Sequence, residues 1–193
     1  MARLEYVRHR GEVADRIRLR RGGRLTPLDG MLLHSPPVAD GWNSLLGAIR
    51  TRCTLPDDIR ELAILRVAEL NGAVYEWRAH EPVARAAGLT DDRLTALRAE
   101  GDRTSLTPAQ AAALRYTDAM TKNVTVPAEV FEEVRGHFDD RQLVELTATI
   151  GTYNLVSRFL VALEVGSEQG EPGRGESLSP GESLSPGDGE LSA

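Results

Sequence analysis

"LPDDIRELAILRVAELNGAVYEWRAHEPVARAAG", residues 55–88, predicts two consecutive helices and decides the fold class. Its first half opens with Pro56 and two aspartates, which suit the first turn of a helix because they complement the helix dipole. Apolar residues then recur around much of the helix circumference, so we expect this helix to be deeply buried. Asn71 and Gly72 interrupt the pattern, and the second helix is expected over about 74–87.

Helical periodicity continues on both sides of this stretch. Prolines, threonine caps and acids stand near the beginnings of several segments, as is typical of helix starts. The further predicted helices cover residues 35–49, 90–100, 107–123, 127–138 and 139–165. No segment shows sustained strand alternation between hairpin turns. The sequence therefore predicts an all-α fold of about seven or eight helices.

Charge and composition divide the chain into three predicted parts. Residues 1–24 form an arginine-rich arm, with eight arginines against three acids, and residues 25–165 form the helical domain. The arginines alternate with acids and apolar residues, which favours a solvent- or subunit-contacting arm over a nucleic-acid-binding one. Residues 166–193 are an acidic Gly/Ser/Pro tail containing the tandem repeat "GESLSPGESLSP" (175–186). Such a segment buries too little apolar surface to fold, so we expect disorder.

The composition also bears on several classes of protein. Cys53 is the only cysteine, so neither an intrachain disulfide nor a zinc site of several cysteines is possible. Glu76 and His80 have the spacing of half a metal-ligand set, but no second pair accompanies them, so we expect no metal. No apolar run approaches the roughly 20 residues that span a bilayer, and the start "MARLEYVRHR" lacks the apolar core of a signal peptide. A cytoplasmic protein without membrane contact is expected.

Glu76 and His80 form the first candidate chemical pair. They lie four residues apart, on one helix face, where a carboxylate favours the imidazolium form and can orient the ring. His80 could then act as a general acid or base, although such pairs are also common on exposed helix surfaces. Glu61 lies in the apolar helix, where a buried carboxylate could relay a proton or simply pair with Arg60 or Arg66.

Other polar and aromatic residues give weaker signals. His34 precedes a helix start, where capping or packing is the simpler role, and Tyr75 and Trp77 have the character of packing residues. Tyr153 and Asn154 lie within an apolar helix, where polar groups need partners. They could line a pocket or cross a subunit interface.

Three segments carry a resemblance to a known family. "LPDDIRELAILRVAELNGAVYEWRAHEPVARAAGLTDDRL", "LTPAQAAALRYTDAMTKNVTVPAEVFEEV" and "LVELTATIGTYNLVSRF" resemble the carboxymuconolactone decarboxylase family, in this order. That family belongs to the all-helical superfamily of the AhpD-type alkylhydroperoxidases. The resemblance covers about residues 25–165. It implies an AhpD-like fold and a homo-oligomer, either a trimer or a hexamer.

The resemblance also includes a departure that matters for chemistry. The peroxidase branch of the superfamily uses a Cys-x-x-Cys pair before a histidine, with an upstream glutamate as proton relay. Ala73 and Glu76 occupy the cysteine positions here, His80 the histidine position and Glu61 the relay position. Peroxide reduction by that route needs a nucleophilic thiolate and a resolving thiol, and Cys53 stands alone outside the motif. The sequence therefore resembles the branch without the cysteine pair.

The decarboxylase branch implies an acid/base reaction that needs no cofactor, on a small carboxylated or lactone-type molecule. His80 would donate the proton, Glu76 would orient and tune it, and Glu61 would relay protons. The candidate substrate contacts are Tyr75, Trp77, an arginine such as Arg85, His34, Tyr153 and Asn154. Two alternatives remain open: an alkylhydroperoxidase-like redox protein, and a family member that binds a small molecule without catalysis.

Overall fold

The computed structural model describes residues 1–8, 11–98 and 101–166. The tail that the sequence predicts to be disordered lies outside the described residues from 167 onward. Within the described residues the chain forms nine α-helices and no strand. They are α1 (Glu12–Arg20), α2 (Pro27–Leu32), α3 (Pro36–Thr51), α4 (Asp57–Leu70), α5 (Val74–Ala86), α6 (Asp91–Ala96), α7 (Pro108–Asn123), α8 (Ala128–Arg135) and α9 (Asp140–Ala162). The predicted all-α fold class is confirmed.

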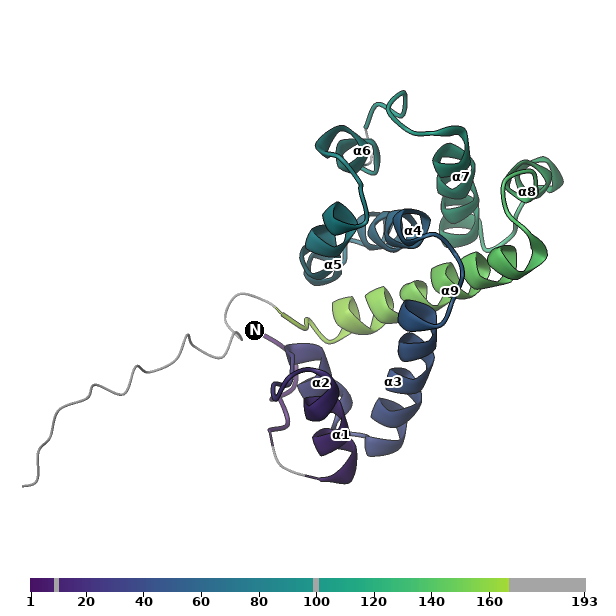
Figure 1. Ribbon diagram of the computed structural model, residues 1–193. Helices are drawn as coiled ribbons and strands as arrows, with labels where there is room; N and C mark the ends of the chain where they lie inside the picture. The colour runs from purple at the N-terminus through teal and green to yellow at the C-terminus, as the bar shows by residue number, and fades with distance from the viewer. Residues whose placement is uncertain (9–10, 99–100, 167–193) are drawn as a thin grey trace, which may run out of the picture.

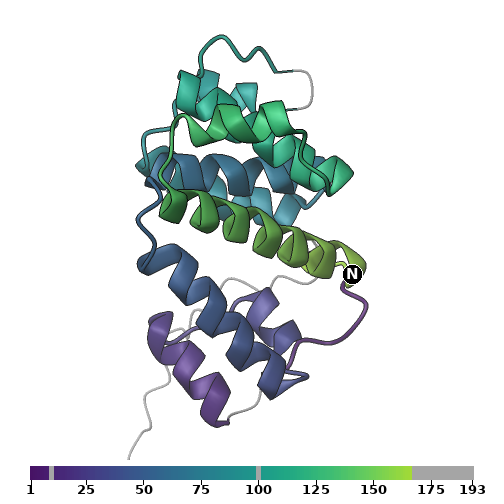
Figure 2. The ribbon, with the colours of Figure 1, turned by 90° about the vertical axis from the view of Figure 1, so that its right-hand side faces the viewer.

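The long helix α9 runs through the middle of the molecule (Figure 1). Helices α1, α2 and α3 lie on one side of it, and α4 to α8 lie on the other, as the view turned by 90° also shows (Figure 2). Helix α4 packs against α5, α7 and α9, and α3 connects the two sides by packing against α9. None of the helices in the described ranges is long and apolar enough to cross a membrane.

Helix α4 is the centre of the core. Ten of its 14 residues are buried, because neighbouring helices cover it on several sides. This explains why its apolar residues follow no single stripe. Its burial also encloses three charged residues: Arg60, which is 7% exposed, and Glu61 and Arg66, which are each 1% exposed. Each of them therefore needs partners inside the protein.

Helices α1 and α2 are two more than the seven stretches that the sequence analysis names. Helix α2 has only six residues, too few for periodicity to reveal it. It begins with a capping box in which Thr26 and Asp29 bond each other's backbone amide. Helix α1 lies inside the predicted arm 1–24, and its Ala14 and Ile17 are buried in the core. Part of the arginine-rich segment thus contributes to the fold.

The first residues of the chain bind to distant parts of it. The Arg3 amide donates to the Leu163 carbonyl, and the Val7 amide donates to the Gly30 carbonyl, both over 3.0 Å. A side chain at position 30 would meet the Val7 carbonyl oxygen at 3.3 Å, so glycine allows this close approach. These contacts connect the N-terminal segment to α2 and to the residues after α9.

Candidate active site

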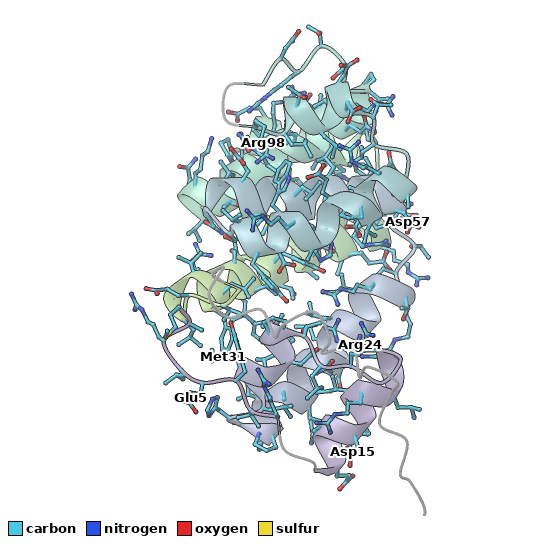
Figure 3. All side chains as sticks on the ribbon, turned by 90° about the vertical axis from the view of Figure 1, so that its left-hand side faces the viewer. Glu5, Asp15, Arg24, Met31, Asp57 and Arg98 are labelled. Carbon is cyan, nitrogen blue, oxygen red and sulfur yellow. The ribbon has the colours of Figure 1, made fainter. Side chains whose placement is uncertain are left out.

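A cavity of about 330 Å³ lies between the α1–α3 group and helices α4 and α5. Figure 3 shows these two groups of helices with their side chains: Asp57 lies at the beginning of α4 in one group, and Arg24 lies in the segment after α1 in the other. Four of the predicted site residues line it: Glu61, Tyr75, Glu76 and His80. The full lining comprises Arg21, Thr26, Leu28, Arg50, Arg60, Glu61, Tyr75, Glu76, Ala79, His80 and Val83.

His80 is held between two carboxylates. Its Nδ1 lies 2.7 Å from Glu61 Oε2, and its Nε2 lies 3.1 Å from Glu76 Oε1. Glu76 and His80 are one turn apart on α5, while Glu61 comes from α4, on which α5 packs. All three side chains are buried, with His80 7% exposed. The arrangement is a buried carboxylate–imidazole–carboxylate chain that reaches a cavity.

The two carboxylates decide the charge of His80. Burial by itself disfavours the imidazolium, but the hydrogen bonds and negative charges of Glu61 and Glu76 outweigh it and raise the pKa of His80. The ordinary value is 6.5, so the imidazolium of His80 persists to a higher pH than that of an ordinary histidine. His80 therefore keeps its proton at the cavity over a wider pH range than an ordinary histidine does.

Glu61 has an arginine partner as well as His80. Its Oε1 accepts from Arg60 Nε over 3.2 Å, and Arg60 Nη1 lies 2.7 Å from Asp57 Oδ1. Of the two arginines considered from sequence, Arg60 makes this contact. Arg66 instead binds Asp118, at 2.6 Å between Nε and Oδ1.

Tyr153 connects His80 to another cation. Its hydroxyl lies 3.3 Å from His80 Nε2 and accepts a hydrogen bond from Arg50 Nε over 3.0 Å. The Tyr153 and His80 rings meet edge to face, with centroids 5.2 Å apart. Burial raises the pKa of Tyr153 far above its ordinary value, although the Arg50 charge opposes this. The phenol is therefore a neutral hydroxyl beside His80.

Tyr75 forms part of the cavity wall. It is half-buried, and it interacts with the Thr26 side chain and the Leu28 backbone. Burial raises its pKa, so it too presents a neutral phenol. Through these contacts the N-terminal helices close one side of the cavity above α5.

Trp77 does not line this cavity. It follows Glu76 by one residue, which turns it about 100° around the helix. Its Nε1 donates to Glu81 Oε2 over 2.9 Å, and the Arg98 guanidinium lies over its ring, 3.4 Å from the centroid. Trp77 is thus a buried packing residue on a different face of α5, and it lies outside the cavity beside His80.

Arg85 and His34 also lie away from the cavity. Arg85 is on the exposed surface and pairs with Glu81 at 2.9 Å and with Asp91 at 2.6 Å. His34 is exposed, and its Nε2 lies 2.8 Å from the Glu5 carbonyl oxygen, which suits a packing role. The arginines that line the cavity are Arg21, Arg50 and Arg60, and Arg85 is not among them.

Asn154 belongs to a separate polar network between helices. Its Nδ2 donates to Thr121 Oγ1 over 3.1 Å, and its Oδ1 accepts from Asn71 Nδ2 over 3.0 Å and from Arg158 over 2.6 Å. These bonds satisfy a buried amide where α9 meets α7 and the end of α4. Asn154 and Tyr153 are neighbours in sequence, but only Tyr153 touches His80.

Sequence reasoning missed Arg21, Thr26 and Arg50 as cavity residues. They come from α1 to α3 or the segments beside them, far from His80 along the chain. No spacing rule connects them to α5, because their proximity arises from the packing of α3 on α9. The only local signal was the capping box at Thr26, which marks a helix start and not a site.

Cys53 lies in the segment between α3 and α4 and does not line the cavity. Burial, together with the nearby Glu145 carboxylate, raises the pKa of its thiol and disfavours the reactive thiolate. Across residues 1–8, 11–98 and 101–166, no group of three or more His, Cys, Asp or Glu side chains has the arrangement of a metal site.

Comparisons with known proteins agree with this fold. The chain is 32% identical over 106 residues to the uncharacterised protein YdfG of Bacillus subtilis (strain 168), which is 54% of this chain and 72% of YdfG. A protein of unknown function from Agrobacterium tumefaciens, suggested to be the antioxidant defence protein AhpD, superposes with a TM-score of 0.65. The two are 25% identical, over 69% of this chain and 92% of that one.

A second solved structure shows the fold alone. It is an uncharacterised peroxidase-related protein from Silicibacter sp. TM1040, with a TM-score of 0.73 and 15% identity over 89% of this chain and 94% of that one. Residues 36–119, which include α3, α4, α5 and the cavity residues Glu61 and His80, match the carboxymuconolactone decarboxylase family. The chain belongs to the carboxymuconolactone decarboxylase family, with an AhpD-like helical fold.

Proposed function

We propose that the protein is an acid/base enzyme that needs no cofactor and acts on a small carboxylated or lactone-type molecule. The reaction would be decarboxylation or a related proton transfer. One observation carries this proposal: a buried histidine with a raised pKa is held between two carboxylates at a cavity. Such a group suits general acid catalysis near neutral pH.

The residues around His80 allow a balanced proton transfer. When a carboxylated unsaturated lactone loses CO2, the electron pair of the broken C–C bond remains on the lactone skeleton, which then takes a proton at carbon. The imidazolium of His80 would supply this proton from Nε2, while Nδ1–H stays bonded to Glu61. The Nε2 lone pair left behind can accept from the hydroxyl of Tyr153, 3.3 Å away. Bulk water then restores the proton.

The charges at the cavity favour an anionic substrate. Three arginines line it, but Arg21 pairs with Asp29, and Arg60 pairs with Asp57 and Glu61, so Arg50 is the arginine without a directly bonded acid. The positive charge of Arg50 would attract a carboxylate and stabilise the electron-rich intermediate. It supports the carboxylated substrate class that the sequence resemblance implies.

A thiol peroxidase receives less support from the geometry. Cys53 carries the only thiol in the chain. It lies outside the cavity, and burial raises its pKa. Replacement of Cys53 with serine should therefore leave turnover at the His80 cavity unchanged. Peroxide turnover that disappears in Cys53→Ser would instead establish the redox function.

The test is incubation with a panel of small carboxylated γ-lactones in D2O, followed by mass spectrometry. The proposal predicts loss of CO2 or isomerisation, together with one deuterium bound to carbon in the product. The alternative of a binding protein without catalysis predicts bound lactone and unchanged mass after long incubation. That second result, obtained with a lactone shown to occupy the cavity, would contradict the proposal.

A further inference from the structure

Arg50 differs from the other two arginines of the cavity. Arg21 Nε lies 2.8 Å from Asp29 Oδ2, and Arg60 is bonded to both Asp57 and Glu61. Arg50 has no carboxylate within ion-pair distance among residues 1–8, 11–98 and 101–166. Its positive charge at the cavity is therefore not matched by a directly bonded acid, in contrast to the other two.

The orientation of Arg50 is nevertheless fixed. Its Nε donates to the Tyr153 hydroxyl over 3.0 Å, and its guanidinium carbon lies 5.9 Å from the centroid of the Tyr153 ring. In the part of the chain that the structure describes, its two terminal nitrogens make no hydrogen bond. A guanidinium held at Nε with both Nη groups available can bind a carboxylate through two parallel hydrogen bonds.

Arg50 also keeps its charge at this position. Burial would lower its pKa, but the polar contact with Tyr153 and the charges of Glu76 and Glu61 outweigh burial and raise it. Because Tyr153 is a neutral hydroxyl, the direct partner of Arg50 does not cancel its charge. A ligand anion that bound Arg50 directly would neutralise this charge.

We propose that Arg50 binds a carboxylate of the substrate that is retained in the product, with Tyr153 as its positioning residue. This inference rests on the proposed function. An ion pair with the departing carboxylate would stabilise the substrate more than the transition state, since the charge leaves that group as CO2 forms. The bound carboxylate is therefore the one that stays, and a decarboxylated substrate would carry a second carboxylate as its leaving group.

The experiment measures binding and requires no turnover. A product-like probe, 5-oxotetrahydrofuran-2-carboxylate, is titrated into the full-length protein by isothermal calorimetry, and its uncharged methyl ester is titrated in parallel. The variants are Arg50→Gln and Arg50→Lys. Arg52→Gln is the matched control, because Arg52 is an exposed arginine two residues further along and outside the cavity. Circular dichroism verifies that each variant is folded.

The wild-type protein should bind the acid about tenfold or more tightly than the ester, as expected for a charged bidentate hydrogen bond. Arg50→Gln should weaken binding of the acid about 10- to 100-fold and abolish this preference. The affinity of Arg50→Lys for the acid should lie between those of the wild type and Arg50→Gln. The affinity of Arg52→Gln should match that of the wild type. Two results would overturn the inference. One is that the wild type and Arg50→Gln bind the acid equally tightly. The other is that the wild type binds the acid no more tightly than the ester.

Failure of the proposed function looks different. Binding that depends on Arg50, without conversion of any lactone, would refute the enzyme proposal and leave Arg50 as the carboxylate-binding residue. Should Arg50→Gln fail to fold, the Arg50→Lys variant still decides the matter, because it retains the charge but loses the bidentate geometry. Its affinity for the acid should then fall while its affinity for the ester stays unchanged.

Discussion

Helix α4 carries three buried charged residues, and the surroundings of the two most deeply buried, Glu61 and Arg66, differ. Arg66 is enclosed by acceptors: Asp118 binds both Nε and Nη2, at 2.6 and 2.9 Å, and the Leu97 and Arg98 carbonyls bind Nη1. Glu61, five residues earlier, belongs to a chain of groups that ends at a cavity. Both sites are equally buried, at 1% exposure.

The difference indicates that the buried charge of Arg66 stabilises the fold, whereas the buried charge of Glu61 serves the candidate site. At Arg66 each strong hydrogen-bonding group is satisfied by the protein, so little capacity remains for a ligand. At the cavity, His80 shares its proton with two carboxylates, and Arg50 has only a neutral hydroxyl as direct partner. The candidate site therefore differs from the ion pair in the core because its polar groups lie beside a cavity and can still bind a ligand.

The largest effect is expected for His80→Gln. This change removes the transferable proton, so kcat on an accepted lactone should fall by about 10²- to 10⁴-fold. The glutamine amide can still donate to one of the two carboxylates, which limits the structural damage. Mass-spectrometric rates should be compared at a temperature where both proteins are folded by circular dichroism. A His80→Gln enzyme with the wild-type rate would remove His80 from the chemistry.

Arg66→Met tests the other side of the comparison. It breaks the buried pair with Asp118, and we expect the free energy of unfolding to fall by about 3 kcal/mol. Arg103 and Lys122 remain within 3.2 and 3.4 Å of Asp118 and should limit the loss. Urea denaturation gives the change in stability, and kcat of the folded fraction should stay at the wild-type value. A large drop in kcat without a drop in stability would contradict the purely structural role of Arg66.

A smaller effect is expected for Tyr153→Phe. The change removes the hydroxyl that fixes Arg50 and contacts His80 but retains the buried ring. A hydrogen bond to a charged group contributes about 1.5–3 kcal/mol, so KM should rise by about tenfold or more. Steady-state kinetics that separate KM from kcat provide the measurement. A change confined to stability, with both kinetic constants unaltered, would show that Tyr153 serves packing alone.

The fold was predictable because its signals are local. Helix starts, apolar periodicity and the break at Asn71 and Gly72 are all carried by neighbouring residues, and α3 to α9 follow the predicted stretches closely. The proximity of Glu76 and His80 was predictable for the same reason, since four residues make one helical turn. Helix α1 was missed because its arginine-rich segment was interpreted as an arm, and α2 was missed because it has only six residues.

The rest of the candidate site depends on packing between distant segments. Arg50 reaches the cavity because α3 packs on α9, and no local pattern encodes that contact. Trp77 shows the converse: it is next to Glu76 in sequence, but one residue turns it about 100° around the helix and away from the cavity. The oligomeric state and the roles of the site residues stay predictions.

The most direct test of the central claim is an NMR titration of His80 in the full-length protein. The chain has four histidines, and His80→Gln identifies the signal. We expect an imidazolium that persists above the ordinary value of 6.5, because Glu61 and Glu76 raise the pKa of His80. Its contribution to stability should then be complete below pH 6.5 and disappear as pH rises through the raised pKa. A His80 that loses its proton at or below pH 6.5 would contradict the account.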